Sequence, residues 1–345
     1  MRGAGGYQMF GITPAPIFDP AQGLPYLKHF MAFFRPGDIV KFKSIDRAAY
    51  DAALDQYSFR AANLLVGNDE NAAVLECSLL GPELRLLDDA IIAVTGSAMT
   101  PKLDGTLAAT GEAIAVRAGT VVSFDFMRAG ARAYIAVAGG IDVPVVLGSR
   151  STYGLGAFGG FLGRKLAAGD VLKTSPAPAG ARAGRRLPAE LAMPLPKEVE
   201  LRVMPGLYYH RITEASAARF FEDTWTVAPE ADRIGYRYRN GRPLEFCPRR
   251  QPFGAGSDPS NIVDAGYPYG SIQVPGGVEP IILHRDAVSG GGYAMIGTVI
   301  SADMDRIAQM QPNYKTSFVK VDLGTALTAR ADHQQRLDQL RAALR

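Results

Sequence analysis

The feature of this sequence that most restricts its fold is a series of short apolar or alternating runs. In the first half of the chain they occupy residues 75–80, 84–87, 91–95, 114–116, 121–126 and 133–138. Turn-forming pairs such as Gly81-Pro82 and Asp104-Gly105 separate them. Many short strands at nearly regular spacing are typical of a β-barrel or a β-sandwich. We therefore expect a mainly β protein with a few helices.

The rest of the pattern divides the chain into units. A proline-rich linker occupies residues 176–197. We expect one barrel-like unit over 54–175, a second over 198–323 and a final helix over 324–345. Shorter helices are predicted at 55–66, 214–221 and 301–310. The Gly-Gly-Tyr motif at 291–293 repeats one at 5–7, and such repetition indicates related structural units. We therefore interpret residues 1–46 as the end of a third unit whose beginning is absent.

Charge and side-chain content narrow the functional classes. The formal net charge is +3 and no five like charges are consecutive, so neither nucleic-acid nor membrane-surface binding is predicted. Cys77 and Cys247 form no C-x-x-C pair, and the four histidines lack metal-ligand spacing, so we expect no metal site. His210 and His284 are interpreted as structural. With no signal-peptide pattern and no apolar run that could cross a bilayer, we expect a cytoplasmic protein.

A glycine-rich stretch over residues 148–170 is the first candidate site. Its glycines allow backbone amides to approach a ligand closely. Arg150 lies between Ser149 and Ser151 and offers a planar set of donors for a carboxylate or carbonyl group. A glycine-rich turn without a ligand explains the same residues, so both interpretations stay open.

Two further interpretations of this stretch need separate mention. Arg150 is also suited to brace the loop by pairing with Asp142 or Asp170. A G-x-G-x-x-G pattern begins at Gly154, but a dinucleotide site needs a helix directly after such a pattern. Because more glycines follow and weaken any helix, nucleotide binding is disfavoured.

Polar residues near turns of the second unit form the second candidate site. Ser260 and Asn261 follow Pro259, which stiffens the loop, and can hydrogen-bond a small amide; an ordinary Asx or Ser turn explains them equally well. Gln273 alternates with apolar neighbours, so it lies on the surface or lines a barrel mouth. Asp286 follows an apolar strand and precedes a glycine loop. There a carboxylate serves as a general base, orients an amide or simply caps the turn.

These motifs together resemble the allophanate hydrolase subunit 2 family, also called the biotin-dependent carboxyltransferase family. Its members include the C subunit of 5-oxoprolinase, the Kip antagonist of a sporulation kinase inhibitor and the second half of the carboxyltransferase domain of urea carboxylase. The resemblance covers about residues 54–340. It is carried by residues 61–68 (AANLLVGN), 75–76 (LE), 133–144 (AYIAVAGGIDVP), 147–152 (LGSRST), 232–237 (DRIGYR), 270–275 (GSIQVP) and 291–293 (GGY).

The first 46 residues resemble a different protein, the tail of the companion subunit 1 family, which includes the B subunit of 5-oxoprolinase. The motifs at 5–8 (GGYQ) and 35–38 (RPGD) match its closing signatures. The opening strand and loop that family members carry ahead of the helix at 55–66 are missing. We therefore expect a fused protein with a large internal loss, or a fragmentary gene. The resemblance implies cyclophilin-like β-barrels for both units.

The same resemblance implies a function. It points to a subunit of an ATP-dependent 5-oxoprolinase, or of a related biotin-dependent carboxyltransferase, that acts on a small amide or lactam. The alternatives are a urea-carboxylase-type half and a non-catalytic Kip-like regulator. Asp286 is then the catalytic carboxylate. The residues expected to hold the substrate are Ser149, Arg150, Ser151, Ser260, Asn261, Gln273, Gly291, Gly292 and Tyr293.

The resemblance also implies partners. The chain itself is expected to bind no cofactor, so ATP or carboxybiotin is supplied through partner subunits. These are a companion that resembles the B subunit of 5-oxoprolinase, together with either a lactam-utilisation subunit or a biotin carboxylase. A homo-oligomer is a further option.

Overall fold

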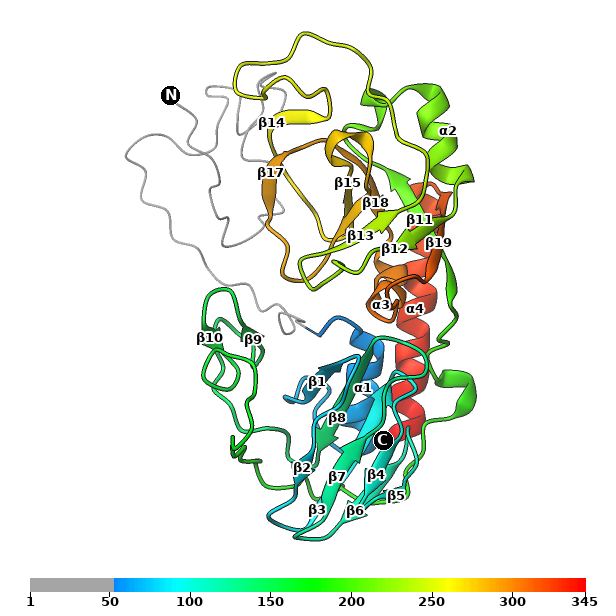
Figure 1. The fold of residues 1–345 in the computed structure, drawn as a ribbon. Helices are drawn as coiled ribbons and strands as arrows, with labels where there is room; N and C mark the ends of the chain where they lie inside the picture. Colours follow the sequence, from blue (N-terminus) through cyan, green and yellow to red (C-terminus); the bar gives the residue numbers. More distant parts are fainter. Residues whose placement is uncertain (1–52) are drawn as a thin grey trace, which may run out of the picture.

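The computed structural model describes residues 53–345, which form two β-rich units beside one long helix (Figure 1). Helix α1 (Gln56–Leu65) and strands β1 to β10 belong to the first unit, and strands β11 to β19 to the second. Helix α4 (Leu323–Leu344) contacts both units. The mainly β class predicted from the sequence is confirmed. The prediction for residues 1–46 lies outside the described part of the chain.

Two four-stranded antiparallel sheets build the first unit, with strand orders β1-β8-β3-β6 and β2-β7-β4-β5. Their bounds are β1 Leu75–Ser78, β2 Leu84–Arg85, β3 Ala90–Gly96, β4 Pro101–Leu103, β5 Thr106–Leu107, β6 Ala113–Val116, β7 Val121–Phe124 and β8 Arg132–Val137. Each apolar run predicted there contains a strand. The β4–β5 hairpin was not predicted, although Asp104 and Gly105 (φ 48° and 82°) supply the left-handed turn that such hairpins favour.

The first unit packs as layers. Ile92 and Val116 of one sheet meet Val122 of the other in an apolar cluster. On β3 the next side chain, Ala93, points the opposite way and packs with α1, as strand alternation requires. The strands of residues 53–197 therefore pair as a sandwich of two sheets, and no closed barrel forms in that part of the chain.

Residues 176–197 connect the units and pack against the first one. The amide of Ala113 donates to the carbonyl oxygen of Arg185 at 2.9 Å, and the Tyr57 hydroxyl donates to that of Leu191 at 2.7 Å. A short 3-10 helix, Ala189–Leu191, lies in this segment. The proline-rich segment is thus held by hydrogen bonds at several points along its length.

The second unit is a closed seven-stranded barrel of order β11-β18-β15-β16-β13-β12-β19. It closes because β11 pairs antiparallel with β18 on one side and parallel with β19 on the other. The barrel predicted for this unit is confirmed. Its strands are β11 Glu198–Pro205, β12 Trp225–Val227, β13 Gly235–Arg239, β15 Ser271–Gln273, β16 Ile281–Leu283, β18 Met295–Val299 and β19 Lys315–Lys320.

Aromatic side chains fill the barrel and the side covered by helix α2 (Glu214–Glu222). Leu201 and Val203 of β11 point inward, as the alternating sequence of that strand predicts. The Phe220 ring of α2 stacks on Phe318 with centroids 4.6 Å apart. Their burial fixes α2 against the barrel, since each large apolar side chain removed from water contributes roughly 1.5–3 kcal/mol.

The helices begin at polar caps. Asp55 and Asp322 accept from the backbone of the first turns of α1 and α4, and Thr213 does so for α2. The predicted helix 301–310 is shorter in the structure: a 3-10 turn, Ser301–Asp303, precedes helix α3 (Met304–Ala308). Neither of these two short elements begins with a side-chain cap hydrogen bond. The other 3-10 helices are Tyr209–Arg211 and Pro275–Gly277.

Gln309, just after α3, joins the two units. Its Oε1 accepts from the amides of Ala131 and Arg132 at 3.0 and 3.1 Å. Its Nε2 donates to Asp55 Oδ2 at 2.6 Å and to the carbonyl oxygen of Arg132 at 3.0 Å. From the same end of the second unit, Asp305 Oδ1 accepts from the amide of Gln56 at 2.8 Å. The junction is therefore a buried polar network in which each unit completes the hydrogen bonds of the other.

Candidate functional site

The glycine-rich segment extends from the first unit and carries a small ribbon, β9 (Thr152–Tyr153) and β10 (Phe158–Gly159). A hollow of about 300 Å³ lies within it, lined by residues 142–144 and 157–163. The G-x-G-x-x-G pattern falls on the ribbon, and within residues 53–197 no α-helix follows it. The structural context of a dinucleotide site is therefore absent from that part of the chain.

Arg150 is exposed beside this hollow, and its Nη1 donates to the carbonyl oxygen of Val143, one of the lining residues. Asp170, one of the two bracing partners considered from the sequence, instead pairs with Arg164 at 2.7 Å. Arg150 thus keeps donors for a ligand at the edge of the hollow. Two flanking hydroxyl oxygens lie 2.9 Å apart there, those of Ser149 and Ser151.

The second candidate site is a two-stranded ribbon outside the barrel, formed by β14 (Asn261–Gly266) and β17 (Gly290–Tyr293). Asn261 pairs with Tyr293, and a register shift separates them from the next pair. The Tyr267 hydroxyl donates to the carbonyl oxygen of Tyr293 at 2.7 Å and accepts from its amide at 2.8 Å. Tyr267, which sequence analysis did not single out, therefore anchors the ribbon.

Glycines and Gln273 complete the surroundings of Tyr267. A Cβ at Gly291 would lie 3.1 Å from the Tyr267 ring, and one at Gly292 would lie 3.3 Å from the carbonyl oxygen of Ile262. Gln273 is buried and its side chain interacts with the Tyr267 phenol. Burial raises the pKa of Tyr267 to about 12, so the phenol stays protonated. The structure thus brings Gln273, one of the residues expected to hold the substrate, into contact with the ribbon.

In the loop before β14, one of the two predicted site residues already makes side-chain hydrogen bonds within the protein and the other does not. Ser260 is buried, and its Oγ donates to Asp258 Oδ1 at 2.6 Å and accepts from the amide of Gly276 at 2.9 Å. Ser260 therefore stabilises the loop, as its turn interpretation predicts. The side chain of Asn261 is half-buried and makes no hydrogen bond within residues 53–345. Of these two residues, Asn261 is the one with a free amide.

Asp286 lies in an ion-pair chain between the units. Both of its oxygens accept from Arg233, at 3.0 and 3.3 Å, and Arg233 Nη1 donates to Glu76 of the first unit at 2.6 Å. Glu76 in turn accepts from the Tyr134 hydroxyl at 3.0 Å. Because one guanidinium engages both oxygens of this carboxylate, the arrangement favours an orienting role for Asp286.

The histidines occupy positions that suit structural roles. His284 is buried, and its Nδ1 accepts from the amide of Arg285 at 3.0 Å. Burial lowers the pKa of His284 well below its usual value, so the ring is neutral. His210 is exposed, with its ring centroid 6.5 Å from that of Tyr208.

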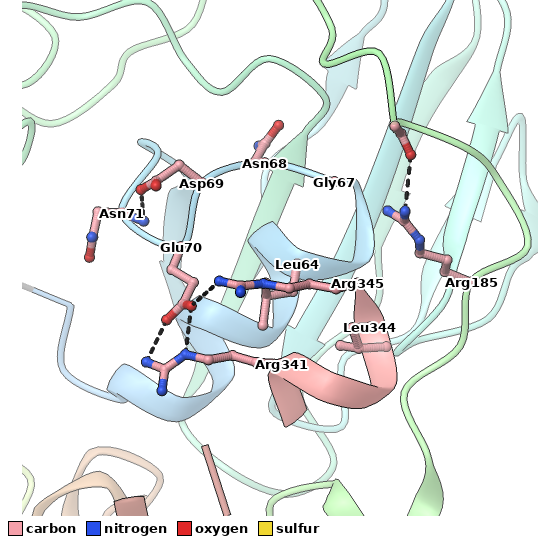
Figure 2. A pocket seen from close by; sticks show the side chains of 11 residues that line it. Leu64, Gly67, Asn68, Asp69, Glu70, Asn71, Arg185, Arg341, Leu344 and Arg345 are labelled. Atoms are coloured by element: carbon pink, nitrogen blue, oxygen red, sulfur yellow. Dashed lines mark hydrogen bonds and ion pairs between the residues drawn. The ribbon is translucent and has the colours of Figure 1, made fainter. Parts of the chain in front are cut away.

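A separate hollow of about 420 Å³ lies between the ends of α1 and α4 and the connecting segment (Figure 2). Glu70 points into it and accepts from Nε and Nη2 of Arg341 at 2.7 and 2.9 Å, and Arg345 lies 3.5 Å away (Figure 2). These charges compensate one another. None of the predicted site residues lines this hollow, so it is not the candidate site.

Residues 52–320 match the carboxyltransferase domain family, subdomains A and B. This chain belongs to that carboxyltransferase family. The match spans both units, the glycine-rich segment and the β14–β17 ribbon, so every predicted site residue falls within the carboxyltransferase region. Within residues 53–345, the helices include none that is long and apolar enough to cross a membrane.

Several relatives in the carboxyltransferase family have names that describe an activity. The chain is 36% identical over 288 residues to the C subunit of 5-oxoprolinase from Escherichia coli, covering 84% of this chain and 88% of that protein. It is 33% identical over 274 residues to urea amidolyase of Saccharomyces cerevisiae, covering 77% of this chain and 15% of that protein. Both kinds of relative match more than three quarters of this chain.

Solved structures show the same fold. The urea carboxylase of Kluyveromyces lactis superimposes with a TM-score of 0.77 at 33% identity, covering 83% of this chain and 26% of that one. The urea amidolyase of K. lactis gives the same TM-score and identity and is covered over 18% of its length. The carboxyltransferase-family chain therefore corresponds to about a quarter or less of these large urea enzymes.

Proposed function

We propose that this chain is the C-type subunit of a 5-oxoprolinase-like enzyme and binds a small amide or lactam. The observation that carries the proposal is coverage: the chain spans 88% of the C subunit of E. coli 5-oxoprolinase but only 15% of the yeast urea amidolyase. A chain that matches a separate subunit nearly end to end is suited to act as that subunit.

Two groups of side chains are available for the amide. In the first unit Arg150, with its neighbouring hydroxyls, suits a carbonyl or carboxylate. In the second unit Asn261 offers both an amide donor and an acceptor beside Tyr293. Asp286 orients Arg233 rather than removing a proton. ATP or carboxybiotin is supplied through a B-type companion and either a lactam-utilisation subunit or a biotin carboxylase, and the complex is placed in the cytoplasm.

The test is reconstitution with a B-type companion and a lactam-utilisation subunit. We expect 5-oxoproline-dependent ATP hydrolysis and glutamate release only when this chain is included. The variant that tests the binding group replaces Asn261 by aspartate. Aspartate keeps the size of the side chain but removes the amide donor. Full turnover by the companions without this chain would contradict the proposal.

A second candidate is the urea-carboxylase-type half. It is favoured by the TM-score of 0.77 to K. lactis urea carboxylase. The same preparation, combined with a biotin carboxylase and a biotinylated carrier, separates the two. Urea-dependent consumption of carboxybiotin, with no turnover of 5-oxoproline, would replace the first proposal with this one. Binding to a companion without turnover in either assay would favour a Kip-like regulator.

A further inference from the structure

A buried arginine beside the β14–β17 ribbon lacks hydrogen-bond partners. Arg211, at the end of the 3-10 helix before α2, is only 6% exposed. Its Nη2 donates to the carbonyl oxygen of Pro259 at 2.8 Å, but its Nε and Nη1 are sealed from solvent and have no acceptor in residues 53–345. Orphaned donors on a buried cation carry a large penalty, and buried arginines are normally paired with an acid.

The charges around Arg211 make its position more unusual. The charged side chain that acts most strongly on Arg211 is a second cation, Arg249, whose Nη2 donates to the carbonyl oxygen of Asn261 at 3.0 Å. Burial and this like charge both lower the pKa of Arg211. The other groups that face it are the Cys247 thiol and the Tyr208 phenol.

No carboxylate in residues 53–345 forms an ion pair with either arginine. The acid on the same loop, Asp258, instead accepts from the amide and hydroxyl of Ser260, at 2.8 and 2.6 Å. Two guanidinium groups thus converge on the Pro259–Asn261 segment without a compensating anion. Such a pair is suited to receive one from outside the chain.

The loop of residues 248–258 adjoins Arg211, because its Arg249 acts on that guanidinium and the carbonyl oxygen of Pro259, directly after the loop, accepts from it. Residues 248–258 contain no strand or helix and are mostly exposed, and the side chain of Phe253 is 98% exposed. Its internal hydrogen bonds are short-range: the amide of Ala255 donates to the carbonyl oxygen of Pro252 at 3.1 Å, Arg249 Nε to Gln251 Oε1 at 3.0 Å, and Gln251 Nε2 to the carbonyl oxygen of Asp258. A mostly exposed segment held by such local bonds opens at low free-energy cost, which gives a ligand access to Arg211.

We propose that Arg211 and Arg249 form a subsite for the carboxylate group of a small acid, reached when the 248–258 loop moves. Arg249 donates to the backbone of Asn261 itself, so the subsite adjoins the free side-chain amide of that residue, and a ligand that fills both is an amide that also carries a carboxylate. That last step rests on the proposed function of the ribbon. A neutral amide would leave both arginines uncompensated.

Calorimetric titration of the full chain with two matched probes tests this. The probes are 5-oxoproline (2-pyrrolidone-5-carboxylate) and its 5-carboxamide. The two molecules differ in charge but hardly in shape. We expect the acid to bind about tenfold or more tightly than the carboxamide, the scale of a charged hydrogen bond. Arg249→Met should abolish this preference, and so should Arg211→Met if that variant folds. The control Arg237→Met removes an exposed charge on β13 and should retain it.

Alkylation of Cys247 by iodoacetamide locates the site. Cys247 is half-buried, and its amide donates to the carbonyl oxygen of Arg211 at 2.7 Å, whereas burial raises the pKa of Cys77 to about 12 and keeps that thiol unreactive. The acid should change the Cys247 labelling rate saturably at the calorimetric midpoint. Equal affinity for acid and carboxamide, a preference that survives Arg249→Met, or inorganic phosphate binding in place of the acid would overturn the inference. Turnover of 5-oxoproline in the reconstituted enzyme would still stand as a separate result.

Discussion

At the scale of single residues, Arg150 is set apart by its exposure. Its guanidinium reaches the carbonyl oxygen of Val143 yet stays open to solvent beside the 300 Å³ hollow. Its side chain therefore holds little of the fold and keeps most of its five donors for a ligand. Arg211 shows the opposite combination, deep burial with unused donors.

The first prediction concerns Arg150→Lys. Lysine keeps the charge but loses the planar donor geometry, so the affinity for a small amide or acid should fall by about tenfold or more. The melting temperature should stay unchanged because the side chain is exposed. Calorimetric titration and thermal melts measure the two effects. A lowered melting temperature with unaltered affinity would show that Arg150 only braces the loop.

The second prediction concerns pH. Burial, reinforced by the nearby charge of Asp305, raises the pKa of Asp55 from 3.8 to about 7. The folded chain thus holds a proton that the unfolded chain releases, so this group contributes stability at low pH that is lost as pH rises from about 4 to about 7. Asp305→Asn keeps an acceptor for the amide of Gln56 but removes the charge. The slope of unfolding free energy against pH should become shallower in that variant.

Urea unfolding of wild type and Asp305→Asn between about pH 5 and pH 8 gives both slopes. The buried His284 and the half-buried His333 titrate in the opposite sense, since burial lowers the pKa of each. The difference between the two slopes is attributed to the coupled Asp55–Asp305 pair, because burial also raises the pKa of Asp305 and the variant removes that carboxyl. Identical slopes would show that the two aspartates are not coupled.

At the scale of elements, the turn after β8 connects that strand to the glycine-rich segment. Gly139 has a φ of 97°, and a Cβ there would lie 1.9 Å from the carbonyl oxygen of Ser175. The carboxyltransferase motif at 133–144 therefore needs a glycine at this point both for its backbone conformation and for the close approach of the connecting segment.

The third prediction compares Gly139→Ala with Gly119→Ala. Gly119 has a similar φ of 91°, but a methyl group added there would meet nothing within 4 Å. Gly119→Ala should cost only the left-handed strain, about 1 kcal/mol, whereas Gly139→Ala adds an overpacking penalty and should cost roughly 3 kcal/mol or more. Denaturant unfolding measures both. Equal losses would mean that the connecting segment yields easily at Ser175.

At the scale of the whole molecule, the two units are joined by buried polar groups. Gln309 makes four of these hydrogen bonds, and the chain from Asp286 through Arg233 to Glu76 adds ion pairs across the same junction. Such networks stabilise when complete and are costly when one member is lost. The relative placement of the glycine-rich hollow and the β14–β17 ribbon depends on this junction.

The fourth prediction is that Gln309→Leu loosens the junction. It leaves buried donors and an acceptor unsatisfied, so stability should fall by roughly 2–4 kcal/mol, and scanning calorimetry should resolve two transitions, one for each unit. Gln334→Leu, at an exposed position on α4, is the matched control and should melt like the wild type. A single transition with an equal shift in both variants would contradict the role given to Gln309.

The sequence by itself determined the local elements of this protein. Alternation in 198–203 and the cap at Asp55 depend only on neighbouring residues, so they identify β11 and α1 without knowledge of the fold. The carboxyltransferase motifs likewise indicated the family before any contact was known. A period of two tells which side chains of a strand face inward, because successive side chains alternate, but it does not name the strand on either side.

Only the tertiary structure decided how those elements combine. Strand pairing closed the second unit into a barrel, because β11 pairs with a strand on each of its edges. The strands of the first unit pair as two separate sheets. It also assigned Asp286 to an ion pair with Arg233, which in turn reaches Glu76, 157 residues away along the chain. Arg211 could not be distinguished from any other arginine in the sequence. Its significance depends on which acceptors surround it, and burial and long-range packing alone determine that.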